Sequence, residues 1–254
     1  MEMKNTIAII SGGASGMGAA TARLLSRSDV RIAIFDMNLR LAEKIADEIK
    51  GLAIQCDIKD EKSTDIAFKT VTAVFGQPRI CINCAGIARS GRMVNQKGPM
   101  PLDEIREVIE VNLIGTLNLM RLAAAAMIPL DPVGESNERG VIINTASIAA
   151  FEGQIGQTAY SASKGGVVSL TLPAARELAQ FGIRVMTIAP GLVDTPMFDN
   201  LSKETKLSLS KTVPFPKRLV KPNEYAQLVQ HIIENSMLNG EVIRLDGALR
   251  MQEK

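Results

Sequence analysis

The sequence predicts an α/β fold in which a doubly wound parallel sheet of about seven strands is covered by helices on both faces. Short apolar runs alternate with longer segments of helical periodicity through most of the 254 residues. The runs are almost continuously apolar, as strands are when helices cover both faces of a parallel sheet. No linker divides the chain, so we expect one domain over residues 1–254.

Seven apolar runs are the strand candidates: residues 6–10, 30–35, 52–56, 79–84, 140–146, 183–189 and 241–245. In such sheets, ligands bind beyond the carboxyl ends of the strands, where the strand order reverses. The candidate functional residues therefore need to follow these runs or lie on helices beside them.

The composition argues against several classes of protein. Lys plus Arg is 29 and Asp plus Glu is 27, a net charge of +2, which gives no electrostatic reason to expect nucleic acid as a partner. We see no secretory leader, and charges interrupt the apolar stretches before they reach the roughly 18 residues of a membrane span. We expect a soluble, cytoplasmic protein, or one of the mitochondrial matrix if the source is eukaryotic.

Cys81 and Cys84 have the spacing of half a zinc or redox site. They lie on a predicted buried strand, however, and no second cysteine pair or histidine cluster accompanies them. We therefore predict no metal site and reduced cysteines.

A glycine-rich turn follows the first strand candidate. Gly12, Gly16 and Gly18 have G-x3-G-x-G spacing, with Ser15 and Met17 between them. Without Cβ atoms the backbone can turn sharply and approach a pyrophosphate, and the N-terminus of the next helix can direct free N–H groups at it. The alternative is a turn that binds no ligand.

Acidic residues follow the next two strands. Asp36 stands eighteen positions after Gly18, where a carboxylate can accept both ribose hydroxyls of an adenosine and would repel a 2′-phosphate, which favours NAD over NADP. Asp57 could accept a hydrogen bond from the adenine amino group. Each has an alternative role at the start of a helix.

Small and polar residues end the fourth strand candidate. Asn83, Ala85 and Gly86 would allow a cofactor to pass close to the backbone. Asn112 is a polar insertion in the helical segment 102–127. Because a buried amide must be hydrogen-bonded, we expect it to hold a water or a backbone carbonyl near Lys164.

Ser147, Tyr160 and Lys164 predict the chemistry. In a helix over residues 156–180, Tyr160 and Lys164 lie on the same face. An ammonium at about 4 Å contributes roughly 4 kcal/mol at an effective dielectric of about 20, so we expect Lys164 to lower the pKa of Tyr160 by as much as about three units. Ser147 would orient a carbonyl or alcohol oxygen while Tyr160 exchanges its proton. The alternative is a core tyrosine, a solvated lysine and a capping serine.

Residues 192–222, after Pro190 and Gly191, have weak periodicity and several prolines, which predicts an irregular substrate lid. The apolar candidates to line a hydrophobic pocket are Leu192, Val193, Met197, Phe198, Leu201, Leu207, Leu209 and Phe215. The cations are either solvated or meet the phosphates of a large acyl carrier: Lys203, Lys206, Lys211, Lys217, Arg218 and Lys221.

Over nearly the whole chain, the order and spacing of these motifs resemble the short-chain dehydrogenase/reductase family. The resemblance implies a Rossmann-type fold and a nicotinamide cofactor, with Ser11 and Cys84 standing where the family usually has Thr and Asn. The implied catalytic residues are Ser147, Tyr160, Lys164 and Asn112. The implied cofactor-binding residues are Gly12, Ser15, Gly16, Met17, Gly18, Asp36, Asp57, Asn83, Ala85, Gly86, Tyr160, Lys164, Pro190, Gly191, Val193 and Thr195.

Within that family, segments 140–147, 151–154, 160–166, 182–191 and 239–247 are similar to the NAD-dependent type-2 3-hydroxyacyl-CoA dehydrogenases, also called 17β-hydroxysteroid dehydrogenases. This implies interconversion of (S)-3-hydroxyacyl-CoA and 3-oxoacyl-CoA in fatty acid metabolism. It also implies a homotetramer, assembled through the helices near 102–127 and 156–180 and the last strand. Alternatives are a 3-oxoacyl reductase, a hydroxysteroid dehydrogenase, or a non-catalytic NAD-binding subunit of an assembly.

Overall fold

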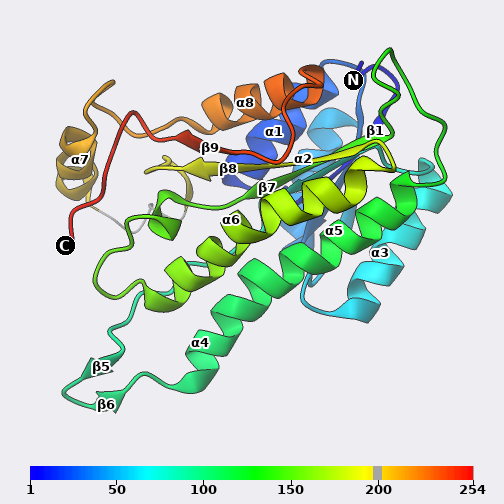
Figure 1. Cartoon of the computed structure of the whole chain (residues 1–254). Coiled ribbons are helices and arrows are strands. Elements are labelled where there is room, and N and C mark those ends of the chain that lie inside the picture. Colours follow the sequence, from blue (N-terminus) through cyan, green and yellow to red (C-terminus); the bar gives the residue numbers. More distant parts are fainter. Residues whose placement is uncertain (197–201, 254) are drawn as a thin grey trace.

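A parallel sheet forms the middle layer of the computed structural model, which describes residues 1–196 and 202–253 (Figure 1). In the described residues it has seven strands in the order β3-β2-β1-β4-β7-β8-β9, so the predicted fold class is confirmed. The strands are β1 (Ile7–Ser11), β2 (Arg31–Asp36), β3 (Leu52–Gln55), β4 (Ile80–Asn83), β7 (Gly140–Thr145), β8 (Ile183–Pro190) and β9 (Val242–Leu245).

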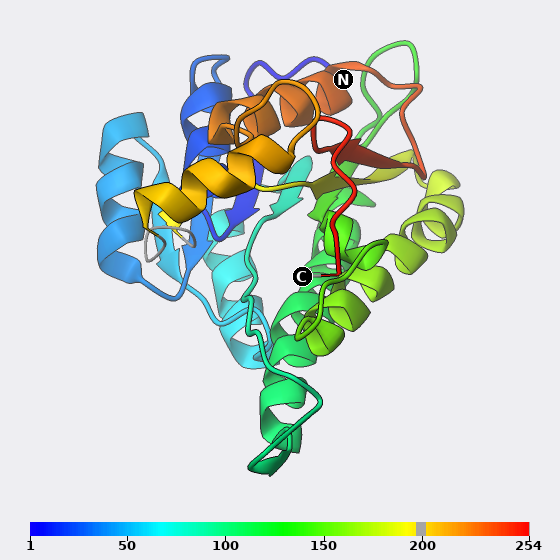
Figure 2. The ribbon, with the colours of Figure 1, turned by 90° about the vertical axis from the view of Figure 1, so that its left-hand side faces the viewer.

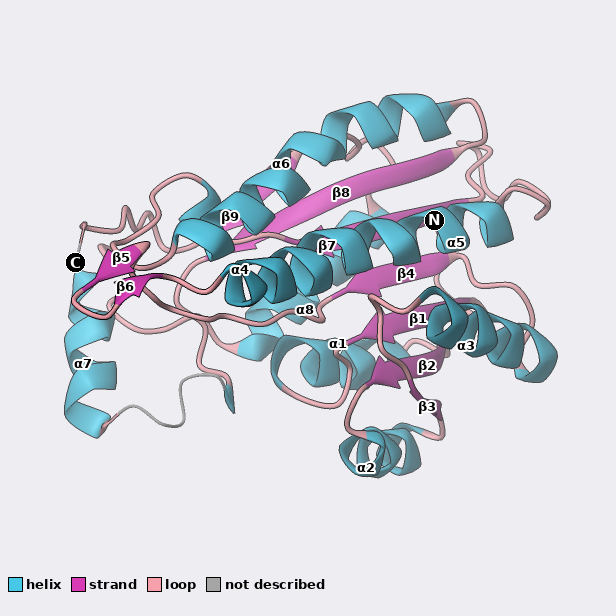
Figure 3. Cartoon of the chain, turned by 90° about the horizontal axis from the view of Figure 1, so that it is seen from below, coloured by secondary structure: helices cyan, strands magenta, loops and turns pink. Residues whose placement is uncertain are grey.

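Helices cover both faces of the sheet, as Figures 1 and 3 show from two sides. One face carries α1 (Gly16–Ser26), α2 (Leu39–Ile49) and α8 (Pro222–Glu234). The other carries α3 (Glu61–Val74), α4 (Leu102–Ile109), α5 (Gly115–Met127) and α6 (Thr158–Ala179). The sheet therefore has two apolar interfaces to fill.

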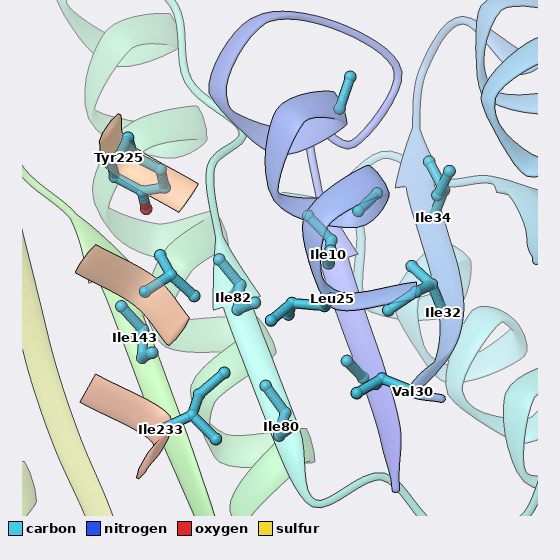
Figure 4. Close-up of a cluster of buried hydrophobic side chains, with 14 of the residues drawn as sticks. Ile10, Leu25, Val30, Ile32, Ile34, Ile80, Ile82, Ile143, Tyr225 and Ile233 are labelled. Atoms are coloured by element: carbon cyan, nitrogen blue, oxygen red, sulfur yellow. The ribbon is translucent and has the colours of Figure 1, made fainter. Parts of the chain in front are cut away.

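Alternate residues of each strand fill these two interfaces. Ile10 and Ile82 pack with Tyr225 on the side of α1 and α8 (Figure 4), whereas Ile9 and Cys81 belong to the cluster on the side of α3 and α5. All five side chains are fully buried. Because successive side chains of a strand point to opposite faces, strands that are buried on both sides must be apolar throughout.

One long helical stretch, Leu102–Met127, combines α4, a π-helical segment (Glu110–Ile114) and α5. By length and mean hydropathy, 1.3 in its most apolar window, it is the one described helix that could cross a membrane, yet half of that window is buried inside the protein. Its apolar residues therefore contribute to the core, as in the long helices of many globular domains.

Two segments differ from the sequence-based expectation. The segment predicted to be irregular contains helix α7 (Lys203–Thr212), which begins where the Ser202 hydroxyl accepts a hydrogen bond from the Thr205 N–H at 3.1 Å. A short hairpin, β5 (Val94–Asn95) with β6 (Gly98–Pro99), follows β4 and was not predicted. Neither segment has strong hydrophobic periodicity, because both lie mostly on the surface.

The strand order reverses between β1 and β4, where the chain leaves in opposite directions across the sheet. A crevice is expected at the carboxyl ends of these two strands. Figure 2 looks onto this end of the molecule, with α7, the β5–β6 hairpin and the C-terminal segment around it.

Candidate active site

A cavity of about 800 Å³ opens at the reversal of strand order. It collects most of the residues predicted to bind a cofactor, although they come from the carboxyl ends of five different strands. The lining includes Gly12, Ser15, Gly16, Met17, Gly18, Asp36, Asp57, Ala85, Gly86 and Thr195.

The glycine turn is shaped for a close approach of backbone to ligand. A Cβ on Gly18 would overlap the carbonyl of Gly12, and one on Gly12 would come within 2.7 Å of the Ala85 nitrogen. Gly12 also has a φ of +65°. Helix α1 starts at Gly16 on the cavity wall, and the Ser15 side chain does not cap it. The turn therefore presents backbone N–H groups to the cavity, which fits a pyrophosphate.

Asp36 stabilises this turn through hydrogen bonds and does not cap a helix. Its carboxylate accepts hydrogen bonds from the Ala14 N–H at 3.1 Å and the Asn38 N–H at 2.9 Å. The N-cap of α2 is Asn38, whose side chain accepts from the Leu41 N–H. The capping alternative for Asp36 is therefore wrong, and its carboxylate lines the cavity beside the glycine turn.

Asp57 is likewise not the cap of its helix. Asp60 caps α3 by accepting a hydrogen bond from the Ser63 N–H at 2.9 Å. The Asp57 carboxylate accepts from the Lys59 N–H at 3.2 Å and lines the same cavity as Asp36. Both acidic residues thus lie on the wall of the cavity that also contains the glycine turn.

Asn83 lies elsewhere. Its side chain is buried and donates a hydrogen bond to the Asn144 side chain on β7 at 2.8 Å. The structure does not bring it to the wall of the cavity, in contrast to Ala85 and Gly86, which follow it. The Asn83 amide therefore ties β4 to β7, because a buried amide needs a partner.

Asn112 lies in the π-helical segment and is fully buried. Its amide accepts from the Ile87 N–H at 2.8 Å, donates to the Ile87 carbonyl at 2.9 Å and donates to the Ser163 hydroxyl at 3.1 Å. The expectation that it holds a backbone carbonyl is confirmed. Asn112 thereby fixes the segment after β4, which forms one wall of the cavity.

A smaller cavity of about 250 Å³ adjoins the first and shares Met17, Cys84, Gly86 and Thr195 with it. Its lining includes the predicted residues Ser147, Tyr160, Lys164, Pro190, Gly191, Leu192, Val193 and Leu209. It also includes Ile148, Gln154, Gln157 and Met251, which we did not single out from the sequence. The first three lie between Ser147 and Tyr160, so their position in that loop was a usable signal, whereas Met251 arrives only through tertiary packing.

Two predicted pocket residues of the lid point elsewhere. Leu207 is 59% exposed and Phe215 is 82% exposed, and neither lines the smaller cavity. Three other candidates, Met197, Phe198 and Leu201, lie outside the described residues. The described lid thus contributes Leu192, Val193 and Leu209 to the pocket.

Two lid cations are paired with carboxylates. Arg218 forms two hydrogen bonds of 2.7 Å with Glu224, and the Lys206 ammonium lies 3.5 Å from Asp194. Arg218 is therefore a poor candidate for a phosphate ligand. Lys211 and Lys217 are exposed.

The proton-transfer residues converge on the smaller cavity. The Ser147 hydroxyl hydrogen-bonds the Tyr160 phenol and also accepts from the Ala149 N–H at 3.1 Å, so its capping role and its proposed functional role coexist. The Lys164 ammonium lies 5.9 Å from the centre of the Tyr160 ring and donates to the Thr145 carbonyl at 2.7 Å. The helical spacing therefore brings both side chains to the wall of the same cavity.

The prediction that Lys164 lowers the pKa of Tyr160 is wrong for the protein chain alone. Burial raises the pKa of Tyr160 above its ordinary value, and the hydrogen bond with Ser147 opposes this only in part. Burial also lowers the pKa of Lys164 to about 8. The spacing argument treated the pair as solvated, whereas desolvation disfavours the charged form of each group.

The cysteines are free thiols. Burial raises the pKa of Cys81 to about 12, which disfavours the thiolate that a metal site needs. Within the described residues, no group of three His, Cys, Asp or Glu side chains could hold a metal ion.

Comparison with known proteins identifies the family. The model of the short chain dehydrogenase family matches residues 6–206. The chain is 50% identical to 3-hydroxyacyl-CoA dehydrogenase type-2 of Bos taurus and 48% identical to that of Homo sapiens, each over 99% of this chain and 97% of the relative. The crystal structure of 3-hydroxyacyl-CoA dehydrogenase type-2 from Mycobacterium avium superposes with a TM-score of 0.93 at 38% identity, over 98% of both chains. The chain therefore belongs to the short-chain dehydrogenase family of oxidoreductases, whose fold uses a nicotinamide cofactor.

Proposed function

We propose that this enzyme uses NAD to oxidise the β-hydroxyl of (S)-3-hydroxyacyl-CoA thioesters to a ketone, and catalyses the reverse reduction. The observation that carries the chemistry is the position of Tyr160 and Lys164 on a cavity that adjoins the nucleotide crevice. The acyl-CoA substrate is supported by the relatives named above.

Each polar residue has a distinct task in this proposal. Ser147 orients the substrate oxygen, and the deprotonated Tyr160 takes the hydroxyl proton. Lys164 would stabilise that phenolate and hold the ribose of a bound nicotinamide cofactor, and Asn112 would support the proton relay by fixing the segment at Ile87. Bound NAD would supply the hydride acceptor, together with a positive charge that favours the phenolate against the burial described above.

The preference for NAD rests on Asp36. Its carboxylate lies on the crevice wall at the end of β2, where it would accept ribose hydroxyls and repel a 2′-phosphate. We expect Asp36→Ala to reduce the ratio of kcat/KM for NAD over NADP by roughly tenfold or more, the size of one lost charged contact. An unchanged ratio would assign selectivity to other residues.

The decisive test is a set of steady-state rates with acetoacetyl-CoA, an acyl-carrier thioester and a steroid ketone. The proposal expects the highest kcat/KM with the coenzyme A thioester and NADH. Tyr160→Phe should lower kcat about 10²- to 10⁴-fold with folding and NAD binding retained. A steroid or carrier-protein preference would favour the alternative dehydrogenases. Intact cellular function of Tyr160→Phe would favour a non-catalytic role.

We also propose a homotetramer. Leu102, Ile114 and Leu117 on the α4–α5 stretch and Leu172 on α6 are all more than 40% exposed. Apolar faces of this kind suit association with further copies of the chain. Light scattering in solution should give four times the monomer mass.

The proposed location is the cytoplasm, or the mitochondrial matrix in a eukaryote, which cell fractionation would test.

A further inference from the structure

Tyr225 on α8 is fully buried, in the same apolar cluster as Ile82 of β4 and Ile143 of β7 (Figure 4). A phenylalanine would satisfy this packing, because a buried hydroxyl costs free energy unless it is hydrogen-bonded. The phenol oxygen lies 2.7 Å from the Thr145 hydroxyl and accepts from the Cys84 thiol at 3.4 Å. The hydroxyl thus joins α8 to the ends of β7 and β4.

These three side chains can satisfy one another in a closed ring. The Thr145 hydroxyl donates to the Cys84 sulfur at 3.8 Å, and the Cys84 thiol donates to Tyr225. That leaves the Tyr225 hydroxyl to donate to Thr145 at 2.7 Å. Each group then donates once and accepts once, an arrangement in which the bonds reinforce one another. The ring holds the Thr145 side chain in one orientation.

The backbone carbonyl of Thr145 is the group that holds the Lys164 ammonium, at 2.7 Å. The next peptide N–H, of Ala146, donates to the Ile188 carbonyl on β8. Because the C=O and N–H of one peptide point in opposite directions, the Thr145 carbonyl points toward β4. In the described sheet, β4 ends at Asn83, which pairs with Asn144 of β7, so no residue of β4 pairs with Thr145. The Lys164 ammonium donates to the Thr145 carbonyl in place of a β4 N–H group.

We propose that Tyr225 is a positioning residue for Lys164, because its hydroxyl fixes Thr145 and thereby the carbonyl that holds the ammonium. The inference rests on the proton-transfer role given to Lys164 above. Without the Tyr225 hydroxyl, Thr145 is less constrained and the ammonium is held less well. A hydrogen bond to the charged form favours that form, so Lys164 would lose its proton more readily and Tyr160 would lose its neighbouring cation. The titratable groups around this contact are Tyr160, Lys164, Cys84 and Tyr225.

The first experiment compares Tyr225→Phe with the wild-type enzyme. At neutral pH, kcat for oxidation should fall about three- to tenfold, the equivalent of one hydrogen bond, with little change in KM for the thioester. The midpoint of the rising limb of the pH profile should move to higher pH. A second readout needs no turnover: labelling of Lys164 by acetic anhydride without added NAD, followed by peptide mass spectrometry, should reach half its maximum at lower pH.

The second experiment tests the route through Thr145. Thr145→Val keeps the branched shape, removes the hydroxyl and should reproduce both changes. Thr145→Ser keeps the hydroxyl and should preserve the wild-type values. The double variant Tyr225→Phe/Thr145→Val should be no more impaired than the more impaired single variant, because both substitutions break the same contact. Additive losses would show that the two hydroxyls act separately and would overturn the proposal.

Ile233→Val is a matched control on the same helix. It removes one buried methylene and should lower stability without moving the pH midpoint or the Lys164 labelling profile. Unchanged labelling and an unchanged midpoint in Tyr225→Phe would refute the positioning role. If that variant does not fold, Thr145→Val carries the same prediction. An enzyme inactive on 3-hydroxyacyl thioesters would refute the proposed function alone, since labelling still tests Tyr225.

Discussion

A cationic side chain is buried at each end of the sheet, and only one of the two is paired with a carboxylate. Arg184, near the start of β8, is 6% exposed and donates to the Glu138 carboxylate at 2.8 Å. It also donates to the backbone carbonyls of Ile232 in the last turn of α8 and of Leu238 after the helix, each at 2.8 Å. Lys164, beside the end of β7, is 5% exposed and donates to the Thr145 carbonyl, and it forms no ion pair with any described residue.

This difference indicates that one cation stabilises the fold and the other takes part in the reaction. A buried charge that is paired and fully hydrogen-bonded keeps its charge and fixes its neighbours, whereas a buried charge without a counter-ion has a shifted pKa. The first description fits Arg184, which joins β8 to the end of α8. The second fits Lys164, whose pKa burial lowers to about 8. The paired cation should thus matter for folding and the unpaired one for turnover.

The largest expected effect is the loss of the paired cation. Arg184→Met should lower the free energy of unfolding by about 3–5 kcal/mol, because it removes the guanidinium from the buried Glu138 carboxylate and leaves it only the Met1 amino group at 3.3 Å. Urea unfolding monitored by circular dichroism measures this. A loss below about 1 kcal/mol would mean that the contacts of Arg184 are dispensable and that the comparison with Lys164 fails.

Lys164→Met should separate activity from stability. We expect kcat to fall about 10²- to 10³-fold, since Tyr160 loses its cation. The free energy of unfolding at neutral pH should rise by up to about 3 kcal/mol, because a pKa lowered from 10.5 to about 8 measures the free-energy cost of burying this charge. Parallel steady-state kinetics and urea unfolding give both quantities. A strongly destabilised variant would contradict the view that Lys164 is retained for chemistry.

The stability difference between wild type and Lys164→Met should depend on pH. The folded pKa of Lys164 is lower than that of the unfolded chain, so the unfolded chain binds more protons between about pH 8 and pH 10.5. The free-energy cost of burying the Lys164 charge therefore destabilises the folded state fully below this pH range and disappears above it. Between pH 7 and pH 9, the wild type should gain about 1 kcal/mol relative to the variant. Urea unfolding at several pH values tests the sign as well as the size.

The smallest expected effect concerns a pair of charges on the surface. Arg23 and Glu48 form a 2.7 Å ion pair in which both side chains are at least 40% exposed. Arg23→Met should change the free energy of unfolding by less than about 1 kcal/mol, because water screens the pair. The same unfolding experiment provides the contrast with Arg184→Met. A cost similar to that of Arg184→Met would show that burial is not what distinguishes these cations.

The sequence predicted those parts of the fold and the site that local patterns determine. The seven strands of the main sheet were located to within a few residues, because they are mostly apolar and the inner strands are buried on both faces, whereas the edge strands β3 and β9 are half-buried. The spacing of Tyr160 and Lys164 placed both on the wall of one cavity. The glycine turn and its neighbour Asp36 also met as expected.

The features that depend on distant residues or on burial were not predicted. Helix α7 has little periodicity, although Ser202 three residues before Thr205 was a capping signal that could have revealed its start. The contact of Tyr225 with Thr145 joins residues that are 80 positions apart. The direction of the Tyr160 pKa was wrong because residue spacing carries no information about desolvation.

The single-residue offset between the ends of β4 and β7 is instructive for protein design. If two paired strands ended at the same position, their last carbonyls would accept hydrogen bonds from each other's N–H groups. When one strand is shorter by one residue, the last carbonyl of the longer strand has no such donor and can accept a hydrogen bond from a side chain. An amine that donates to such an acceptor is held in place without a counter-ion, and burial lowers its pKa, to about 8 for Lys164. A strand shortened by one position, combined with burial, therefore offers designers a way to install a reactive lysine.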